Sequence, residues 1–362
     1  MSRAAVNALH TTDSPVSLAP QRWRVVTLFI ACLVALGIAI ILAVAIGAVS
    51  IPPLAVLELT LARAFGLTRS AAYPDTFDTI LFQIRLPRVA ITALIGAALA
   101  ASGSTYQGLF RNPLADPYLV GVASGAGLGA TLALAFNLHT TSLGLNAVPA
   151  AAFLGAVGTV GVVVLSAQVG RTTPISTMLL AGVAIGAFAT AFTTFLMLRT
   201  PDGMRRAFTW LLGGYNGGGW APFITTLPYL FIGLAVLQIN ARALNILQLD
   251  EEQARQLGIH VERLKIILVA ASTLMTAAAV AFGGLVGFVG LVVPHILRLL
   301  GGHDYRHLIP LSAIGGAAFL ILADLLARTL IAPTELPVGV VTALIGAPFF
   351  VFLLRRLKRS VF

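Results

Sequence analysis

Residues 25–49 read VVTLFIACLVALGIAIILAVAIGAV, and this run contains no charged side chain. About 20 apolar residues in a helix cross the hydrocarbon core of a bilayer. A signal peptide has an apolar region of only about 7–15 residues, although Ala43-Val44-Ala45 resembles a cleavage site. The run therefore predicts a retained membrane-spanning helix, preceded by a flexible cytoplasmic tail over residues 1–21.

The same apolar character extends over the whole chain of 362 residues, in which 58% are hydrophobic and 10% are charged. A soluble domain carries about 25% charged residues, so a soluble enzyme, a disordered chain and a DNA-binding domain are excluded. We expect an all-α polytopic membrane protein of about ten transmembrane helices, forming a single domain over residues 22–362. The predicted spans are 25–48, 87–108, 118–137, 148–168, 175–198, 222–240, 264–282, 286–300, 309–330 and 338–354.

The arginines and lysines predict how the chain is oriented. With both termini in the cytoplasm, 15 of the 23 basic residues lie on the inner side and eight on the outer side. Cytoplasmic loops carry such an excess, which agrees with this orientation. The net charge of +10 is therefore ascribed to contact with the membrane surface, and no nucleic-acid partner is expected.

Chemistry-bearing motifs are scarce. Neither Lys265 nor Lys358 stands in a P-loop, so ATP hydrolysis is expected on another polypeptide. Cys32 is the one cysteine, which excludes a disulfide framework and a thiolate metal site. No Ser-His-Asp or paired-carboxylate set occurs, and we therefore predict no catalytic residue and no cofactor bound by this chain.

Two rival functions remain open from the residues alone. An ion-coupled secondary transporter places an ionisable residue in the membrane, and Asp324 is the fair candidate. Pairing with Arg328 at i,i+4 is the favoured interpretation of Asp324. A membrane enzyme with a metal would use His295, His303 or His307, for which structural or loop roles are favoured, so no metal is predicted.

Three segments interrupt the helical pattern. Residues 112–117, Asn-Pro-Leu-Ala-Asp-Pro, contain an aspartate that can cap a helix, and residues 283–290 are rich in glycine. Irregular backbone at membrane depth is tolerated only inside protein or along a cavity, so both segments indicate a transport pathway. Residues 240–265 form the longest polar loop, in which Asp250 can cap a short helix and Gly258 can end it.

These segments resemble the FecCD family of permease subunits from residue 85 to the C-terminus, in order and at family spacing. The matching runs are Arg85-Leu86-Pro87-Arg88, Gly96-Ala97-Ala98-Leu99-Ala100, Asn112-Pro113-Leu114-Ala115-Asp116-Pro117, Gly287-Phe288-Val289-Gly290-Leu291-Val292-Val293-Pro294-His295, Glu335-Leu336-Pro337-Val338-Gly339 and Gly346-Ala347-Pro348.

The resemblance implies the permease of a type II ABC importer in the bacterial cytoplasmic (inner) membrane. Two copies would form the channel as a homodimer. Two cytoplasmic ATPase subunits would bind ATP and magnesium, and a periplasmic or lipoprotein binding protein would deliver the substrate. Family substrates are ferric siderophores, haem and cobalamin. An iron chelate is expected first, a ferric siderophore before haem, with cobalamin as the alternative.

Site residues follow from the resemblance position by position. The docking residues for the binding protein are Arg85, Arg88 and Arg328. Residues 241–262 match the coupling helices that dock on the ATPase, with Asp250, Glu251, Glu252, Leu257 and Gly258 as contacts. The gates match Asn112, Pro113 and Leu114, and the turn Pro174, Ile175, Ser176 and Thr177, where Pro174 and Ile175 depart from a serine- and threonine-rich turn.

Overall fold

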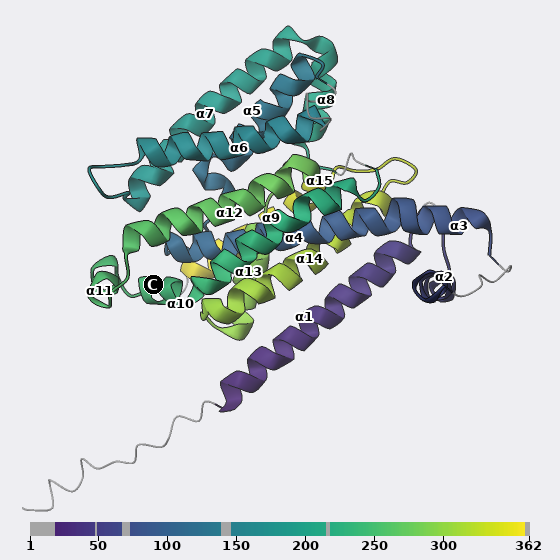
Figure 1. The fold of residues 1–362 in the computed structure, drawn as a ribbon, viewed down its shortest axis with the longest axis horizontal. Coiled ribbons are helices and arrows are strands. Elements are labelled where there is room, and N and C mark those ends of the chain that lie inside the picture. The colour runs from purple at the N-terminus through teal and green to yellow at the C-terminus, as the bar shows by residue number, and fades with distance from the viewer. Residues whose placement is uncertain (1–18, 48, 67–72, 139–145, 215–217, 359–362) are drawn as a thin grey trace, which may run out of the picture.

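The computed structural model describes residues 19–47, 49–66, 73–138, 146–214 and 218–358, and this part of the chain is helical without a β-sheet. Of the predicted tail over residues 1–21, residues 1–18 lie outside the described residues. The helices are α1 Ala19–Ala45, α2 Pro53–Phe65, α3 Asp75–Thr79, a π-helix Ile80–Arg85, α4 Leu86–Leu109, a 3-10 turn Pro117–Val120, α5 Val122–Ala135, α6 Ala147–Ser166, α7 Ile175–Arg199, α8 Pro201–Leu211, α9 Ala221–Ile239, α10 Ala241–Leu247, α11 Glu251–Gln256, α12 Val261–Gly283, α13 Val289–Gly301, α14 Tyr305–Thr329 and α15 Val338–Lys358 (Figure 1).

Ten apolar helices coincide with the ten predicted spans. Within the described residues, seven of them are long and apolar enough to cross a membrane. The predicted span 118–137 is too long, because its first residues form the 3-10 turn and α5 has only 14 residues, whereas the 13 residues of α13 agree with the short segment predicted over 286–300. Each of these short helices is preceded by irregular backbone, which uses up the residues that a complete span would need.

The centre of the molecule consists of α4, α12, α13 and α14 (Figure 1). Helices α5, α6 and α7 pack together on one side, and α1 lies against α14 on the other. Helices α4 and α14 meet at Gly96 and Gly316, where a Cβ on either glycine would lie 2.2–2.3 Å from the other's carbonyl oxygen. Small residues allow such close contact between helices in membranes, so this pair forms the central seam.

A π-helix joins α3 to α4 without a break. At its end, Arg85 is 5% exposed and its Nη1 donates to the carbonyl oxygens of Val44 and Ala45 at 2.5 and 3.0 Å. The last carbonyls of a helix lack partners within it, and a cation is favourable there. Arg85 therefore fastens the end of α1 to the start of α4.

The bundle has two chemically distinct ends, for which we use the following names. The α11 end holds α10, α11 and the loop of residues 110–116, whereas the α8 end holds α3, α8 and the start of α4 (Figure 1). Helix α12 runs from the first end to the second, since it follows α11 and its last residue, Gly283, accepts a backbone hydrogen bond from Gly214.

Candidate functional site

The polar loop at the α11 end folds as predicted around Asp250. Its side chain accepts a hydrogen bond from the backbone NH of Glu252, which caps α11, and Gly258 adopts a φ of +84° just after the helix. Residue spacing predicted one short helix here and the family resemblance predicted helices over residues 241–262, within which the structure has both α10 and α11. Both helices are short, so their positions depend on contacts with the rest of the chain.

Helix α11 presents a mixed acidic and apolar surface. The side chain of Asp250 is 52% exposed and Leu257 is 61% exposed. Glu252 and Gly258 are exposed beside them, and Leu249, at the start of the turn, is 62% exposed. Exposed leucines among charged residues at the end of a membrane protein are typical of a surface that another protein covers.

Behind this surface lies a buried cation, Lys265, which is 3% exposed. Its Nζ lies 2.9 Å from the carboxylate of Glu251 and 3.3 Å from that of Glu262, and it donates to the carbonyl of Thr173 at 3.2 Å. The Glu262 carboxylate in turn accepts from the backbone NH of Thr173 at 2.8 Å. We call Thr173, Glu251, Glu262 and Lys265 the relay cluster. It joins α11 directly to the residue that precedes the predicted gate turn.

Sequence reasoning missed the relay cluster, although one signal for it was present. Basic residues in this chain are almost all arginine, and Lys265 stands three residues after Glu262 inside an apolar helix. A buried ammonium needs paired carboxylates, so this position required acidic neighbours from elsewhere in the fold. Glu251, predicted to contact a partner, has its carboxylate directed to Lys265 and is only 30% exposed.

A second contact joins α11 to the other predicted gate. Arg111 Nη1 donates to the Asp250 carboxylate at 3.2 Å, and this hydrogen bond holds the pKa of Asp250 below its usual value. The adjoining turn is fixed by Asn112, whose side-chain oxygen accepts from the NH of Leu114 at 2.9 Å. The structure thus places both predicted gate segments beside residues bonded to α11. The gate roles of Asn112, Pro113 and Leu114 and of Pro174, Ile175, Ser176 and Thr177 stay predictions.

Farther into the bundle, the two broken helices meet. Asp116 accepts from the NH of Tyr118 at 2.8 Å, which confirms the predicted cap. The Tyr118 hydroxyl donates to the carbonyl of Val286 and accepts from its NH, at 3.0 and 3.1 Å. One side chain thereby satisfies both backbone groups of a residue in the irregular segment before α13. Polar backbone enclosed by helices in this way is characteristic of transport proteins.

At the α8 end, charges from distant parts of the chain come together. Arg88 donates to the carboxylates of Asp324 and Glu335, with closest approaches of 2.9 and 2.8 Å. Arg328 lies 3.1 Å from Asp324, which confirms the predicted i,i+4 pair. We call Arg88, Asp324, Arg328 and Glu335 the arginine cluster. Sequence reasoning did not predict that Arg88 and Glu335 belong to this cluster, because 236 residues separate Arg88 from Asp324.

The three arginines predicted to dock a binding protein differ in the exposure of their side chains and in the partners they already have. Arg85 contacts α1 carbonyls, and the side chain of Arg328 is 8% exposed and donates to the carbonyl of Ala43. The side chain of Arg88 is 16% exposed, with Glu335, half exposed, above it. Their docking role is untested and stays a prediction.

The histidines considered for a metal site have separate surroundings. His295 is buried on α13, with its ring 6.3 Å from that of Phe349, whereas His303 and His307 are exposed. Across the described ranges, no group of three His, Cys, Asp or Glu side chains is arranged to hold a metal ion.

These features define an integral membrane protein with broken helices at its centre and a folded, charged loop at one end. The chain belongs to the FecCD transport family, which matches residues 28–356. It is 43% identical to the uncharacterized ABC transporter permease protein YvrB of Bacillus subtilis, over 90% of this chain and 92% of that protein. It is therefore a permease of the ABC importer type, with a translocating rather than an enzymatic role.

Other relatives carry named substrates. The cobalamin import system permease protein BtuC of Halobacterium salinarum is 46% identical, over 82% of this chain and 78% of that protein. The hemin transport system permease protein HmuU of Yersinia pestis is 39% identical, over 83% and 90%. A solved structure assigned to the metal-chelate type of ABC transporter, in an inward-facing conformation, has a TM-score of 0.78 at 29% identity, covering 91% of this chain and 99% of that one.

Proposed function

We propose that this permease imports an iron chelate, a ferric siderophore or haem, that a substrate-binding protein delivers. Two copies form the channel, and a pair of ATPase subunits powers it with ATP and magnesium. The haem and cobalamin permeases among the relatives support a bulky chelate, with cobalamin as the alternative substrate. The observation that carries the mechanism is the bonding of α11 and its Asp250 cap, through Arg111 and through Lys265 and Thr173, to residues that adjoin both predicted gate segments.

The ATPase would contact the exposed surface of α11, through Asp250, Glu252, Leu257 and Gly258. When ATP closes the ATPase pair, α11 would move with it. Because Glu251 is bonded to Lys265, and Lys265 to Thr173, that movement would reach the turn of residues 174–177 at the start of α7. Each state then differs in its contacts with the ATPase, which is what an ATP-driven change of population requires.

In this proposal the α11 end faces the cytoplasm of a bacterial cell, and both termini lie on the same side. The excess of basic residues predicted for this side supports the orientation. The α8 end then faces outward, where the binding protein docks. Arg88 would take a carboxylate of that protein, with Arg85 and Arg328 adding positive potential beneath it. Such charges guide encounter and fix orientation more than they add affinity.

The translocation pathway would run along α7. A cavity of about 520 Å³ lies between α5 and α7 and is lined by small and hydroxylated residues, among them Gly182, Ser124, Thr190 and Thr194. On α7, Phe188 and Leu198 are 71% and 73% exposed. We infer that a second copy covers this helix and completes the channel wall. A wall of small residues lets a bulky chelate pass without binding it tightly.

The proposal is tested by purifying the chain from its native membranes in mild detergent. An ATPase with a P-loop should co-purify in about equal amount, and Leu257→Asp should reduce its recovery. Leu330→Asp is the matched control, since Leu330 is 59% exposed at the opposite end. The purified complex is then reconstituted and offered radiolabelled ferric siderophore, haem and cobalamin in turn.

The outcomes separate the alternatives. Uptake of an iron chelate that requires ATP supports the proposal, and uptake of cobalamin alone replaces its substrate. If no ATPase is recovered even after crosslinking at α11, and transport instead follows an ion gradient, the ABC mechanism proposed for this chain is wrong. Asp324→Asn would then be the first variant to test for ion coupling.

A further inference from the structure

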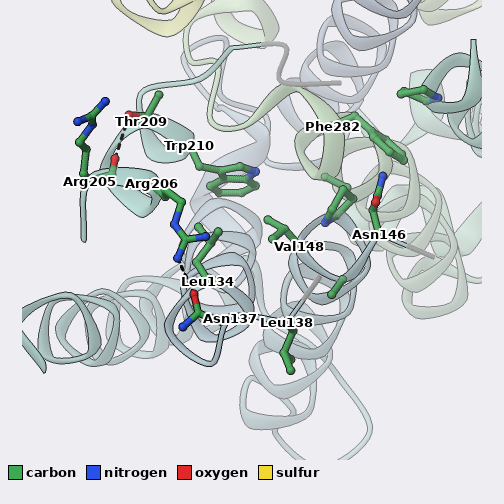
Figure 2. Close-up of a pocket in the computed structure, with 14 residues that line it drawn as sticks. Leu134, Asn137, Leu138, Asn146, Val148, Arg205, Arg206, Thr209, Trp210 and Phe282 are labelled. Atoms are coloured by element: carbon green, nitrogen blue, oxygen red, sulfur yellow. Dashed lines mark hydrogen bonds between the residues drawn. The ribbon is translucent and has the colours of Figure 1, made fainter. Parts of the chain in front are cut away.

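A cavity of about 560 Å³ at the α8 end lies apart from the relay cluster and the predicted gates. Residues of α5, α6, α8, α9 and α12 and of the segments beside them line it, and Figure 2 shows Arg206 and Thr209 on one side and Asn146 and Phe282 on the other. Its polar residues are Asn137, Asn146, Arg205, Arg206 and Thr209. The apolar part includes Leu134, Leu138, Val148, Trp210 and Phe282.

The rim is strongly cationic. Arg206 points from α8 toward the cavity, and its Nη2 donates to the Asn137 side chain at 2.6 Å (Figure 2). Arg205 extends from the same helix in another direction, away from Asn137, and both arginines are exposed (Figure 2). Among the residues that line the cavity there is no aspartate or glutamate. An anion at this rim would therefore meet Arg206 and the amide of Asn137, with the positive potential of Arg205 nearby.

The cavity continues into an apolar groove of about 410 Å³. Five residues line both spaces: Asn146, Pro149, Pro222, Ala281 and Phe282. The groove then follows α6, α9 and α12 past Phe153, Leu154, Tyr229 and Ala278. Leu154 is 68% exposed and Ile224 on α9 is 63% exposed, so these helices present apolar side chains on the outer surface of the bundle.

The dimensions match one leaflet of a bilayer. From Asn146 to Leu154 the helix α6 advances eight residues, or about 12 Å at about 1.5 Å per residue. Half of the hydrocarbon core is about 15 Å thick. A headgroup beside Asn146 would thus leave the acyl chains at the depth of the groove.

We infer that the cavity and groove together bind one anionic phospholipid, with its phosphate at Arg206, the charge of Arg205 nearby, and its acyl chains in the groove along α6 and α9. Charge and shape both favour this occupant over a water-soluble chelate, because a chelate would leave the apolar groove empty. The bound lipid would join α8 to α6, α9 and α12. The inference is independent of the proposed substrate, since it requires only that the chain spans a membrane.

Native mass spectrometry of the purified chain tests the inference. Dioleoylphosphatidylglycerol and dioleoylphosphatidylcholine are titrated separately, and glycerol phosphate serves as a headgroup without chains. We expect one tightly held phosphatidylglycerol per chain, at least tenfold preferred over phosphatidylcholine. Basic residues at the membrane surface attract anionic lipids, so Arg205→Gln with Arg206→Gln should remove most of this preference.

Two further variants make the test specific. Arg199→Gln is the matched control, because Arg199 is exposed at the end of α7 but does not line the cavity. Thr225→Trp places a bulky ring in the groove from an exposed position, and it should lower retention of both lipids. If the double glutamine variant does not fold, Arg205→Lys with Arg206→Lys keeps the charge and should retain the preference.

Three results would overturn the inference. The first is equal retention of the two phospholipids by the unaltered chain. The second is a preference for phosphatidylglycerol that persists in a folded double glutamine variant. The third is displacement of phosphatidylglycerol by glycerol phosphate at equal concentration, which would assign the rim to a free phosphate ester and leave the groove without a role.

Discussion

The arginine cluster and the relay cluster are built from the same chemistry but hold different kinds of structure together. In the arginine cluster, Asp324 is 3% exposed and joins α4 to α14, the two helices of the central seam. In the relay cluster Lys265 is equally buried, yet its carboxylate partners are 24–30% exposed and belong to α11 and the first turn of α12. One cluster therefore fastens the rigid centre, whereas the other connects a short surface helix to a turn.

This difference separates stability from transmission of movement. Breaking a buried pair leaves an uncompensated charge in a place that cannot relax. Breaking a contact between a loop and a turn leaves partners that water can reach, so the cost in folding is smaller. The arginine cluster should therefore govern unfolding, and the relay cluster should govern coupling.

The largest effect is expected for Asp324→Ala. The substitution leaves Arg88 with Glu335 alone and Arg328 without its carboxylate, and loss of one member of a buried pair costs about 3–5 kcal/mol. Unfolding in detergent should shift accordingly. Asp78→Ala is the control, because the exposed Asp78–Arg63 pair contributes at most about 1 kcal/mol. Equal stability of the two variants would contradict a fastening role.

An intermediate effect on folding and a large one on transport are expected for Lys265→Met. Methionine keeps the length of the side chain but releases Glu251 and Thr173 from each other. If the proposed function holds, substrate uptake should fall at least tenfold while the complex still hydrolyses ATP. Arg255→Gln removes an exposed cation that pairs with both Glu251 and Glu262 but leaves Lys265 in place, so it should change uptake little. Loss of both activities in parallel would show that Lys265 supports assembly rather than coupling.

The smallest effect on stability is expected for Arg111→Gln, which removes the exposed contact with Asp250. The pKa of Asp250 is lowered by this contact, so the contact is present above the ordinary aspartate pKa and is lost as pH falls through the lowered value. A spin label at Gln253 should report the change as increased mobility. In the unaltered chain it should become mobile only in acid, and in the variant already at neutral pH. Identical spectra at neutral pH would contradict the link.

Local signals made much of the fold predictable. Apolar runs located the ten helices that could enter a membrane, and proline and glycine marked the two places where helices break. Helices α2, α3 and α8 were not predicted, because they are short or amphipathic and their positions depend on neighbouring elements. The length of α5 was overestimated, since hydropathy does not distinguish a complete span from a half-helix preceded by an apolar loop.

For the candidate site, contacts between residues close in sequence could be predicted, whereas contacts between distant residues could not. The Asp324–Arg328 pair and the Asp250 cap lie within one helical turn, and both were found from spacing. The contacts of Arg88 with Asp324 and of Lys265 with Thr173 cross between elements. They depend on the register of α4 against α14 and of the loop of residues 167–174 against α12, which a single sequence does not contain.

The π-helix of residues 80–85 bears on how chains of this kind tolerate insertions and deletions. An α-helix turns about 100° per residue, and a π-helix accommodates an extra residue without breaking the rod. Loss of one residue from this segment would restore regular α-helical winding. It would also rotate α3 by about 100° around the helix axis relative to α4. Asp78 on α3 could then no longer keep its register with Arg63 while Arg88 faces Asp324. Sequence length in this short stretch is thus constrained as strictly as any side chain in it.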